Sequence, residues 1–183
     1  AFMSMLGITL LNEILDEKNI MSPEKMLNQL RTLVIQSLNK ERKAGDVFTR
    51  DGMDIALCCI VPGENKLLFS GANNGLYILR GSELHELEPD KQPIGAHEHE
   101  NTFSLKEFNV ESGDIVVAFS DGYPDQFGGA KGKKMMYRNF RDIVIRIPET
   151  GSTEQTAHLH REFDKWKGNY SQIDDVCVMG IKI

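Results

Sequence analysis

Apolar residues recur with two different periods along the chain. Near the start they recur every three to four residues, as at Met3, Leu6 and Leu10, which predicts an amphipathic helix. A second helix is expected after Ser22, because Ser is a favoured N-cap and Pro23 suits the first helical position. Both apolar stripes are expected to face the core.

From about residue 54 to residue 119 the pattern changes to short apolar runs separated by turn residues, which predicts strands. The expected strands are 55–61, 66–70, 76–79, 102–108 and 115–119. Between the second and third of these, Asn73-Asn74-Gly75 predicts a hairpin turn, since Asn and Gly tolerate positive φ angles.

Two more helices and a final apolar strand are predicted after residue 119. Their expected core residues are Met136, Phe140, Ile143 and Ile147 in one helix, and Leu159, Phe163 and Trp166 in the other. An order of helices, a run of strands, more helices and a last strand favours the α+β class. With no repeat and no low-complexity linker, residues 1–183 are expected to form a single domain.

The predicted strand 115–119 ends abruptly in Ser120-Asp121-Gly122. A continuous apolar run bounded by turn residues is typical of a strand buried on both faces. A carboxylate at the end of such a rigid strand is well placed to serve as a metal ligand. The alternative is a plain Asp-Gly turn. Ser120 has no recognisable base beside it that would make it a nucleophile, so it is expected to bond the turn.

A second acidic motif, Asp174-Asp175, precedes the last apolar strand. If this strand and 115–119 are antiparallel neighbours, the end of one meets the start of the other, and Asp121 and Asp174 converge. Oxygen-only ligands favour hard ions such as Mg²⁺ or Mn²⁺ over zinc. The alternative is two independent solvated turns.

Composition restricts the function classes. A formal net charge of −6 argues against nucleic-acid binding, which needs a concentrated basic face. The chain has no apolar stretch of membrane-spanning length and no signal-peptide pattern at its start, so a cytoplasmic location without membrane contact is expected. One local exception in charge is the Gly-rich and Lys-rich run 128–134, which would admit a phosphorylated partner or form an exposed flexible loop.

These motifs resemble the manganese- or magnesium-dependent serine/threonine phosphatases of the protein phosphatase 2C (PP2C) class, in the bacterial branch named after sporulation stage II protein E (SpoIIE). The similarity covers essentially all of the chain. It is carried by residues 1–7, 51–57, 71–74, 93–95, 120–122 and 174–175. The resemblance implies an α-β-β-α sandwich.

The resemblance also implies a site. Asp121 and Asp174 match the family's metal ligands, and Asp175 and Gly122 neighbour them and would support them. The complete domain is expected to hold two Mn²⁺ or Mg²⁺ ions and to hydrolyse phosphate monoesters by metal-activated water. No other catalytic residue is assigned, and the substrate-binding residues are unknown.

One departure from the family pattern is expected to matter. Members carry an Asp-containing strand and a Gly-His-Gly turn just before the helix with which this sequence begins. The chain therefore matches an N-terminally truncated domain, the C-terminal portion of a larger protein, whose own activity is in question. Missing strands would leave sheet edges exposed, which predicts a homodimer or element swapping.

The resemblance implies partners as well. They are a phosphoserine or phosphothreonine protein, such as an anti-sigma factor antagonist, and sensory modules in the same chain, within a signal-transduction system of the two-component kind. The alternative is a non-catalytic signalling or interaction domain with the phosphatase fold. A nucleotide hydrolase is disfavoured, because no Gly-rich phosphate loop ending in Lys and Ser or Thr is present.

Overall fold

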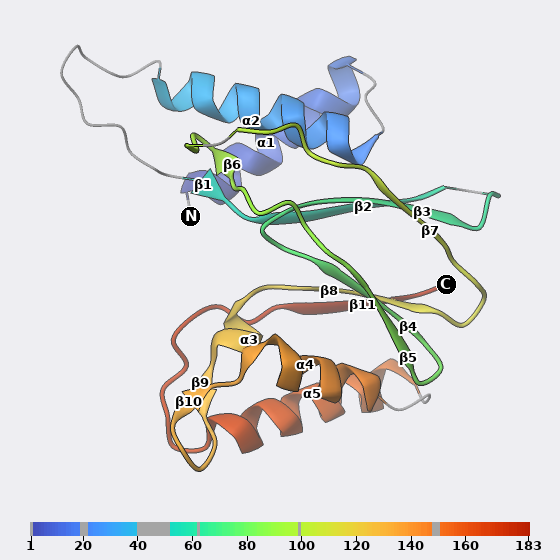
Figure 1. Ribbon diagram of the computed structural model, residues 1–183, viewed down its shortest axis with the longest axis vertical. Helices are drawn as coiled ribbons and strands as arrows, with labels where there is room; N and C mark the ends of the chain where they lie inside the picture. Colours follow the sequence, from blue (N-terminus) through green and yellow to red (C-terminus); the bar gives the residue numbers. More distant parts are fainter. Residues whose placement is uncertain (1, 19–21, 40–51, 62, 99, 148–150) are drawn as a thin grey trace. The chain divides into compact units, whose positions relative to one another are not determined.

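The computed structural model describes residues 2–18, 22–39, 52–61, 63–98, 100–147 and 151–183 (Figure 1). Asp51 of the acidic motif at 51–57 therefore lies outside the described residues. The chain divides into two compact units, which we call the first unit (1–76 and 87–110) and the second unit (77–86 and 111–183). The prediction that residues 1–183 form one domain stays a prediction.

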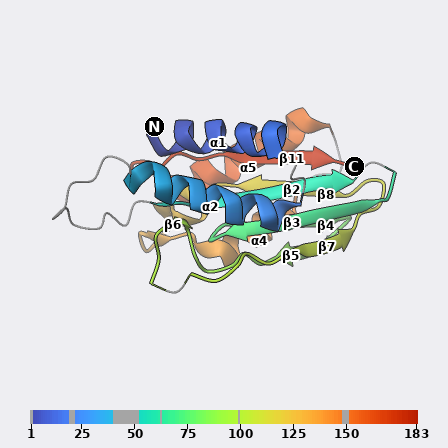
Figure 2. The same cartoon turned by 90° about the horizontal axis from the view of Figure 1, so that it is seen from above.

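The first unit combines two helices with a three-stranded antiparallel sheet in the order β2-β3-β7. Helices α1 and α2 lie side by side, as seen from above in Figure 2. A further short pair joins β1 to β6. The elements are α1 (Phe2–Lys18), α2 (Pro23–Asn39), β1 (Gly52–Met53), β2 (Ile55–Val61), β3 (Lys66–Ala72), β6 (Ile94–Gly95) and β7 (Lys106–Asn109).

Aliphatic side chains fill the core of the first unit. Leu10 and Ile14 of α1 are buried there against Leu27, Leu30 and other residues of α2. The helical stripes predicted from the sequence are therefore confirmed as core. Removal of this apolar surface from water, at roughly 25 cal/mol per Å², is the main force that holds the helices in place.

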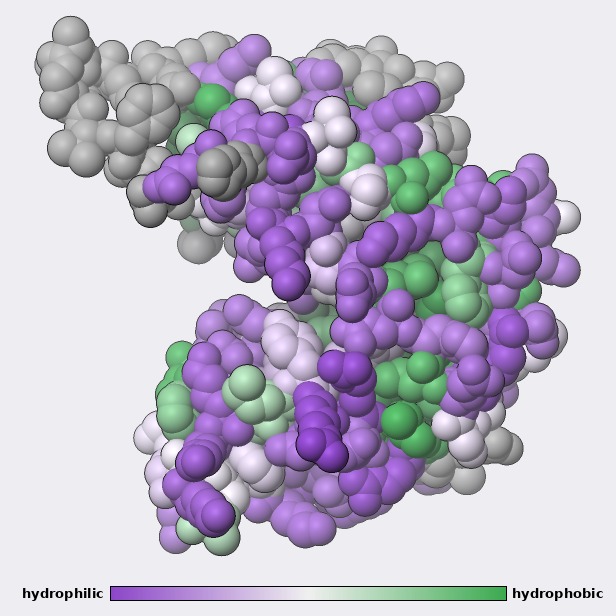
Figure 3. Space-filling view, viewed as in Figure 1, coloured by the Kyte–Doolittle hydropathy of each residue, from purple (hydrophilic) through white to green (hydrophobic). Residues whose placement is uncertain are grey.

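The second unit contains a four-stranded sheet in the order β11-β8-β4-β5 and three helices. Helices α4 and α5 lie along one face of that sheet (Figure 1). The elements are β4 (Leu76–Arg80), β5 (Glu83–Leu87), β8 (Ile115–Phe119), α3 (Gly122–Asp125), β9 (Phe127–Gly128), β10 (Lys133–Lys134), α4 (Met136–Ile145), α5 (Ser152–Lys167) and β11 (Val178–Lys182). Hydrophilic side chains dominate the face of the molecule seen in Figure 3.

Aromatic rings dominate the core of the second unit. The ring of Phe140 lies 4.9 Å from that of Phe119 and 4.7 Å from that of Tyr123, and Tyr123 also contacts Phe163 at 5.0 Å. Such tilted and edge-on pairs stabilise a core beyond simple burial. The predicted inward positions of Phe140 and Phe163 are confirmed. Met136 is 57% exposed, so its predicted core position is wrong, because the helix begins there with a positive φ of 66°.

The predicted antiparallel pairing of the two acidic-ended strands is confirmed. Val178 of β11 lies opposite Phe119 of β8, and Lys182 lies opposite Ile115. The end of β8 therefore meets the start of β11. This register brings the two acidic motifs to the same end of the paired strands.

Two local predictions were wrong. Asn73-Asn74-Gly75 does not close a hairpin, because β3 and β4 belong to different sheets. Asn73 has a φ of 55°, and its main-chain N–H donates to the Asp90 carbonyl. The predicted strand 102–108 begins only at Lys106, because Phe103 and Ser104 donate their main-chain N–H groups to the side chains of Asn28 and Asp90.

Candidate metal centre

Asp121 lies where β8 gives way to the short helix α3. The strand is anchored by Phe119, which is buried in the aromatic core. The Asp121 carbonyl accepts a hydrogen bond from the Asp125 N–H at 2.9 Å, which fixes the turn. The Asp121 side chain is exposed at the end of a rigid strand. This placement matches the sequence prediction.

The second acidic motif is held by its own local hydrogen bonds. The Asp174 Oδ1 accepts from the Asp175 N–H at 2.7 Å, and the Asp174 carbonyl accepts from Gln172 Nε2 at 2.8 Å. Both aspartates are exposed and precede β11. Local side-chain to main-chain bonds of this kind give an irregular segment a defined conformation.

Ser120 joins the two motifs directly. Its N–H donates to the Cys177 carbonyl at 2.9 Å, which continues the ladder between β8 and β11 by one step. Its hydroxyl donates to the Asp175 carbonyl and accepts from the Cys177 N–H, both at 2.9 Å. The expectation that Ser120 bonds within its own turn is therefore wrong, because the facing segment offers a carbonyl and an N–H.

Gly122 allows the two segments to approach closely. Its position is buried, and a Cβ added there would lie 2.4 Å from the Asp175 carbonyl oxygen and 3.4 Å from the Asp174 carbonyl carbon. Any side chain would push the segments apart. The two acidic motifs thus lie on neighbouring segments that are bonded to each other, not on independent turns. Whether Asp121, Asp174 and Asp175 act on a metal stays a prediction.

The chemistry of this site is that of carboxylate and carbonyl oxygens, which suits a hard divalent ion. Within the described part of the chain, no group of three or more His, Cys, Asp or Glu side chains is placed to hold a metal ion. An ion such as Mg²⁺ takes six oxygen ligands and usually keeps several of them as water, so the described residues fit one part of a ligand set.

The basic run 128–134 forms a hydrogen-bonded hairpin next in sequence to this site. Strands β9 and β10 pair with Lys133 opposite Gly128, and the Gly129 N–H donates to the Trp166 carbonyl at 2.7 Å. Lys134 forms an ion pair with Asp125 at 2.7 Å, whereas Lys133 is exposed. The hairpin therefore presents cations from a structured element.

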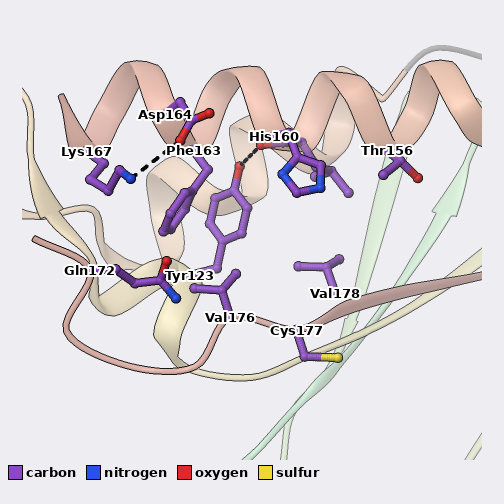
Figure 4. A pocket seen from close by; sticks show the side chains of 11 residues that line it. Tyr123, Thr156, His160, Phe163, Asp164, Lys167, Gln172, Val176, Cys177 and Val178 are labelled. Carbon is purple, nitrogen blue, oxygen red and sulfur yellow. Dashed lines mark hydrogen bonds and ion pairs between the residues drawn. The ribbon is translucent and has the colours of Figure 1, made fainter.

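A pocket of about 410 Å³ lies between α5 and the segment that carries Asp174 (Figure 4). Apolar side chains such as Leu159, Phe163 and Val176 line it, and Tyr123 donates its hydroxyl to the Leu159 carbonyl at 2.7 Å. Burial raises the pKa of Tyr123 above its usual range, so the hydroxyl stays a donor. Sequence reasoning missed this pocket, because its walls come from three separate elements. The helical stripe of α5 was the only signal, and it was interpreted as core.

Comparisons with known proteins agree with the fold. The family model described as Stage II sporulation protein E (SpoIIE) matches residues 1–183. The SiaA-PP2C domain of Pseudomonas aeruginosa superposes with a TM-score of 0.85 at 22% identity, over 100% of this chain and 70% of that chain. No curated protein matches this sequence significantly.

A second structure, from Bacillus subtilis, contains the PP2C phosphatase domain and a fragment of the regulatory domain of the cell fate determinant SpoIIE. It has a TM-score of 0.74 at 17% identity, over 100% of this chain and 50% of that one, so this chain spans half of its length. PppA of P. aeruginosa, a key regulatory component of T6SS, has a TM-score of 0.57 at 16% identity, over 97% of this chain and 76% of that one.

These similarities show an α+β fold of the PP2C type, as the sequence predicted. Among the helices that the structure describes, none has the length and apolar character needed to cross a membrane.

Proposed function

Because this chain belongs to the SpoIIE family, whose fold it has, we propose that it is a metal-dependent protein serine/threonine phosphatase domain of bacterial signalling. One observation carries the proposal beyond the family. The Asp121 turn and the Asp174-Asp175 segment lie against each other, linked by the Ser120 hydroxyl. Two unrelated solvated turns would not need a side chain of one segment that bonds the main chain of the other.

We propose that Asp121 and Asp174 hold a Mn²⁺ or Mg²⁺ ion, and that Asp175 and Gly122 support them. A bound divalent ion supplies Lewis acidity toward phosphate oxygens and water. The chain's own part is positional: β8 fixes Asp121, and the Asp175 N–H fixes the Asp174 carboxylate. A second ion needs ligands that the described residues do not supply, so we expect weak turnover, or none, from these residues alone.

The alternative function is a non-catalytic signalling domain that keeps the fold. The shortage of grouped ligands among the described residues favours it. The two functions differ in one measurable property, because only the phosphatase would couple divalent-ion binding to turnover.

Hydrolysis of p-nitrophenyl phosphate with Mn²⁺ tests the proposal. We would compare the chain with Asp121→Asn and Asp174→Asn, and use Asp142→Asn as a matched control, because Asp142 is an exposed aspartate of α4 that belongs to neither motif. Turnover that is lost in the first two variants and kept in the control supports the phosphatase. Turnover unchanged in Asp121→Asn contradicts the assigned role. No turnover by any form, together with no binding of Mn²⁺ to the unmodified chain, supports the alternative.

The partners of the domain are also proposals. We propose a phosphoserine or phosphothreonine regulator as substrate, such as an anti-sigma factor antagonist, together with sensory modules in the same chain and a cytoplasmic location. Two of the similar proteins are described as a cell fate determinant and a regulatory component, which supports a regulatory role. The exposed cations of the β9–β10 hairpin suit a phosphorylated partner. Release of phosphate from a phosphopeptide tests this proposal. Binding of the same peptide without its phosphate is the control for recognition of the phosphate group.

We further propose that the predicted homodimer forms through β11. In the described residues, β11 has β8 on one side and no strand on the other. Antiparallel pairing of two copies about Gly180 would place Met179, which is 55% exposed, opposite Ile181 of the other copy, which is 39% exposed. Sedimentation should show a dimer that Met179→Lys with Ile181→Lys converts to monomer. A monomeric unmodified chain would contradict this proposal.

A further inference from the structure

We propose that Ser120 is a positioning residue that sets the divalent-ion affinity of the acidic site, because its hydroxyl holds the Asp174-Asp175 segment against the Asp121 turn. This inference rests on the proposed function, since it assigns Asp121 and Asp174 to a metal ion. It adds a role for a side chain that is not itself offered as a ligand.

The two hydrogen bonds of the Ser120 hydroxyl do different work from its main-chain bond. A hydroxyl carries one donor and can also accept, and here the donor goes to the Asp175 carbonyl while the Cys177 N–H is accepted. The main-chain bond from the Ser120 N–H to the Cys177 carbonyl does not depend on the side chain. Loss of the hydroxyl should therefore leave β8 and β11 paired and release the acidic segment that precedes β11.

A short chain of contacts runs from this hydroxyl to the proposed ligand. Ser120 Oγ bonds the Asp175 carbonyl at 2.9 Å, and the Asp175 N–H bonds the Asp174 Oδ1 at 2.7 Å. A shift of residue 175 thus turns the Asp174 carboxylate as well. Partners that orient metal ligands in this way change metal affinity by about 10- to 100-fold when they are removed.

Gly122 supports the same conclusion independently. The Asp175 carbonyl oxygen that accepts from Ser120 is also the atom that an added Cβ at Gly122 would approach to 2.4 Å. One residue pulls this carbonyl toward the turn, and the other leaves room for it. The two residues flank Asp121 on either side, so the position of the acidic segment is set from both neighbours of the proposed ligand.

Binding of Mn²⁺ alone, measured by calorimetry, tests the inference on the full chain. We expect Ser120→Ala to raise the dissociation constant for Mn²⁺ by about 10- to 100-fold. The midpoint of thermal unfolding should stay close to that of the unmodified chain. Ser120→Thr keeps the hydroxyl and should restore most of the affinity. The matched control is Ser112→Ala, an exposed serine in the turn before β8.

The outcomes separate the two proposals. If the unmodified chain binds no Mn²⁺, the proposed metal site fails and this inference fails with it. If it binds Mn²⁺, loses binding with Asp121→Asn and keeps full affinity with Ser120→Ala, only the role of Ser120 is overturned. If Ser120→Ala does not fold, hydrogen exchange of the Cys177 N–H tests the inference instead. This N–H should be protected from exchange in the unmodified chain and in Ser120→Thr, because both carry the hydroxyl that accepts its hydrogen bond. Unprotected exchange in the unmodified chain would overturn the proposed role of Ser120.

Discussion

Strand β8 carries an aspartate at each end, and the two lie in opposite environments. Asp114, before the strand, has a side chain that is only 1% exposed and is bonded to Arg80 through Nε at 2.9 Å and Nη2 at 2.8 Å. It also accepts from the Glu111 N–H at 2.8 Å. Asp121, after the strand, is exposed, and its neighbour Gly122 lies against a second acidic segment.

The difference teaches how an acidic residue at a strand end is put to use. The hydrogen bond from Arg80, together with the Glu111 N–H and the positive charge, lowers the pKa of Asp114 and keeps it charged inside the protein. Its donors come from the protein, so removal of the Asp114 charge would leave the Arg80 guanidinium without its buried partner and destabilise the fold. An exposed carboxylate beside another acidic segment has electrostatic reason to recruit a cation. Burial, not sequence context, separates the two aspartates.

The largest expected effect follows from removal of the Asp121 charge at the exposed end of β8. Asp121→Asn should weaken Mn²⁺ binding, and lower any Mn²⁺-dependent hydrolysis of phosphate esters that the chain shows, by about 100-fold or more, because loss of a ligand removes several kcal/mol of charge stabilisation. Its free energy of unfolding should change by less than about 0.5 kcal/mol, as for most exposed sites. Urea unfolding of the same preparation checks the second statement. A stability loss as large as the activity loss would erase the contrast with Asp114.

The close approach at Gly122 should give the next largest effect. Gly122→Ala forces a Cβ against the Asp175 carbonyl. Overpacking of this kind lowers the free energy of unfolding by about 1–3 kcal/mol, and it should also displace the acidic segment and so weaken Mn²⁺ binding. Gly180→Ala in β11 is the matched control, because its added Cβ would meet only Ile115 Cγ2 at 3.6 Å. Thermal unfolding and Mn²⁺ titration should both be affected in the first variant and neither in the second.

The buried end should behave in the reverse manner. Asp114→Asn removes the charge that Arg80 bonds, and we expect a loss of about 1–3 kcal/mol in unfolding free energy, with Mn²⁺ affinity unchanged. Denaturation in urea gives the first quantity and calorimetry gives the second. A change in Mn²⁺ affinity comparable to that of Asp121→Asn would show that the two ends of β8 are coupled.

Much of the fold could be predicted from the sequence, because its strongest signals are local and periodic. The stripe with Leu10 in α1 and that with Phe163 in α5 both mark buried helix faces. The apolar run 115–119 marked a central strand, and its antiparallel pairing with the last strand was inferred correctly. Asn73-Asn74-Gly75 failed as a hairpin, because which sheet a strand joins depends on distant partners.

The site could be predicted only in part, for the same reason. The acidic residues are visible as ends of apolar runs, so the sequence predicts Asp121 and Asp174 as ligands, and the structure places their segments side by side while the ligand role stays a prediction. The bond from Ser120 to the Asp175 carbonyl joins residues 55 positions apart, and no local pattern announces it. The different fates of Asp114 and Asp121 depend on Arg80, which lies on another strand.

The smallest expected effect is the pH dependence of stability, and it tests the buried end alone. Because the pKa of Asp114 is lower in the folded chain, the unfolded chain binds its proton more readily, and stability rises with pH across this window. The contribution is fully present above the unfolded pKa of about 3.9 and is lost as pH falls through the lowered folded value. Unfolding free energy measured from about pH 6 down to about pH 2 should therefore fall more steeply in the unmodified chain than in Asp114→Asn. If the two plots of unfolding free energy against pH are parallel, Arg80 and Asp114 form no stronger pair than exposed charges do. The proposed distinction between the buried aspartate and the exposed ligand would then rest on solvent accessibility alone.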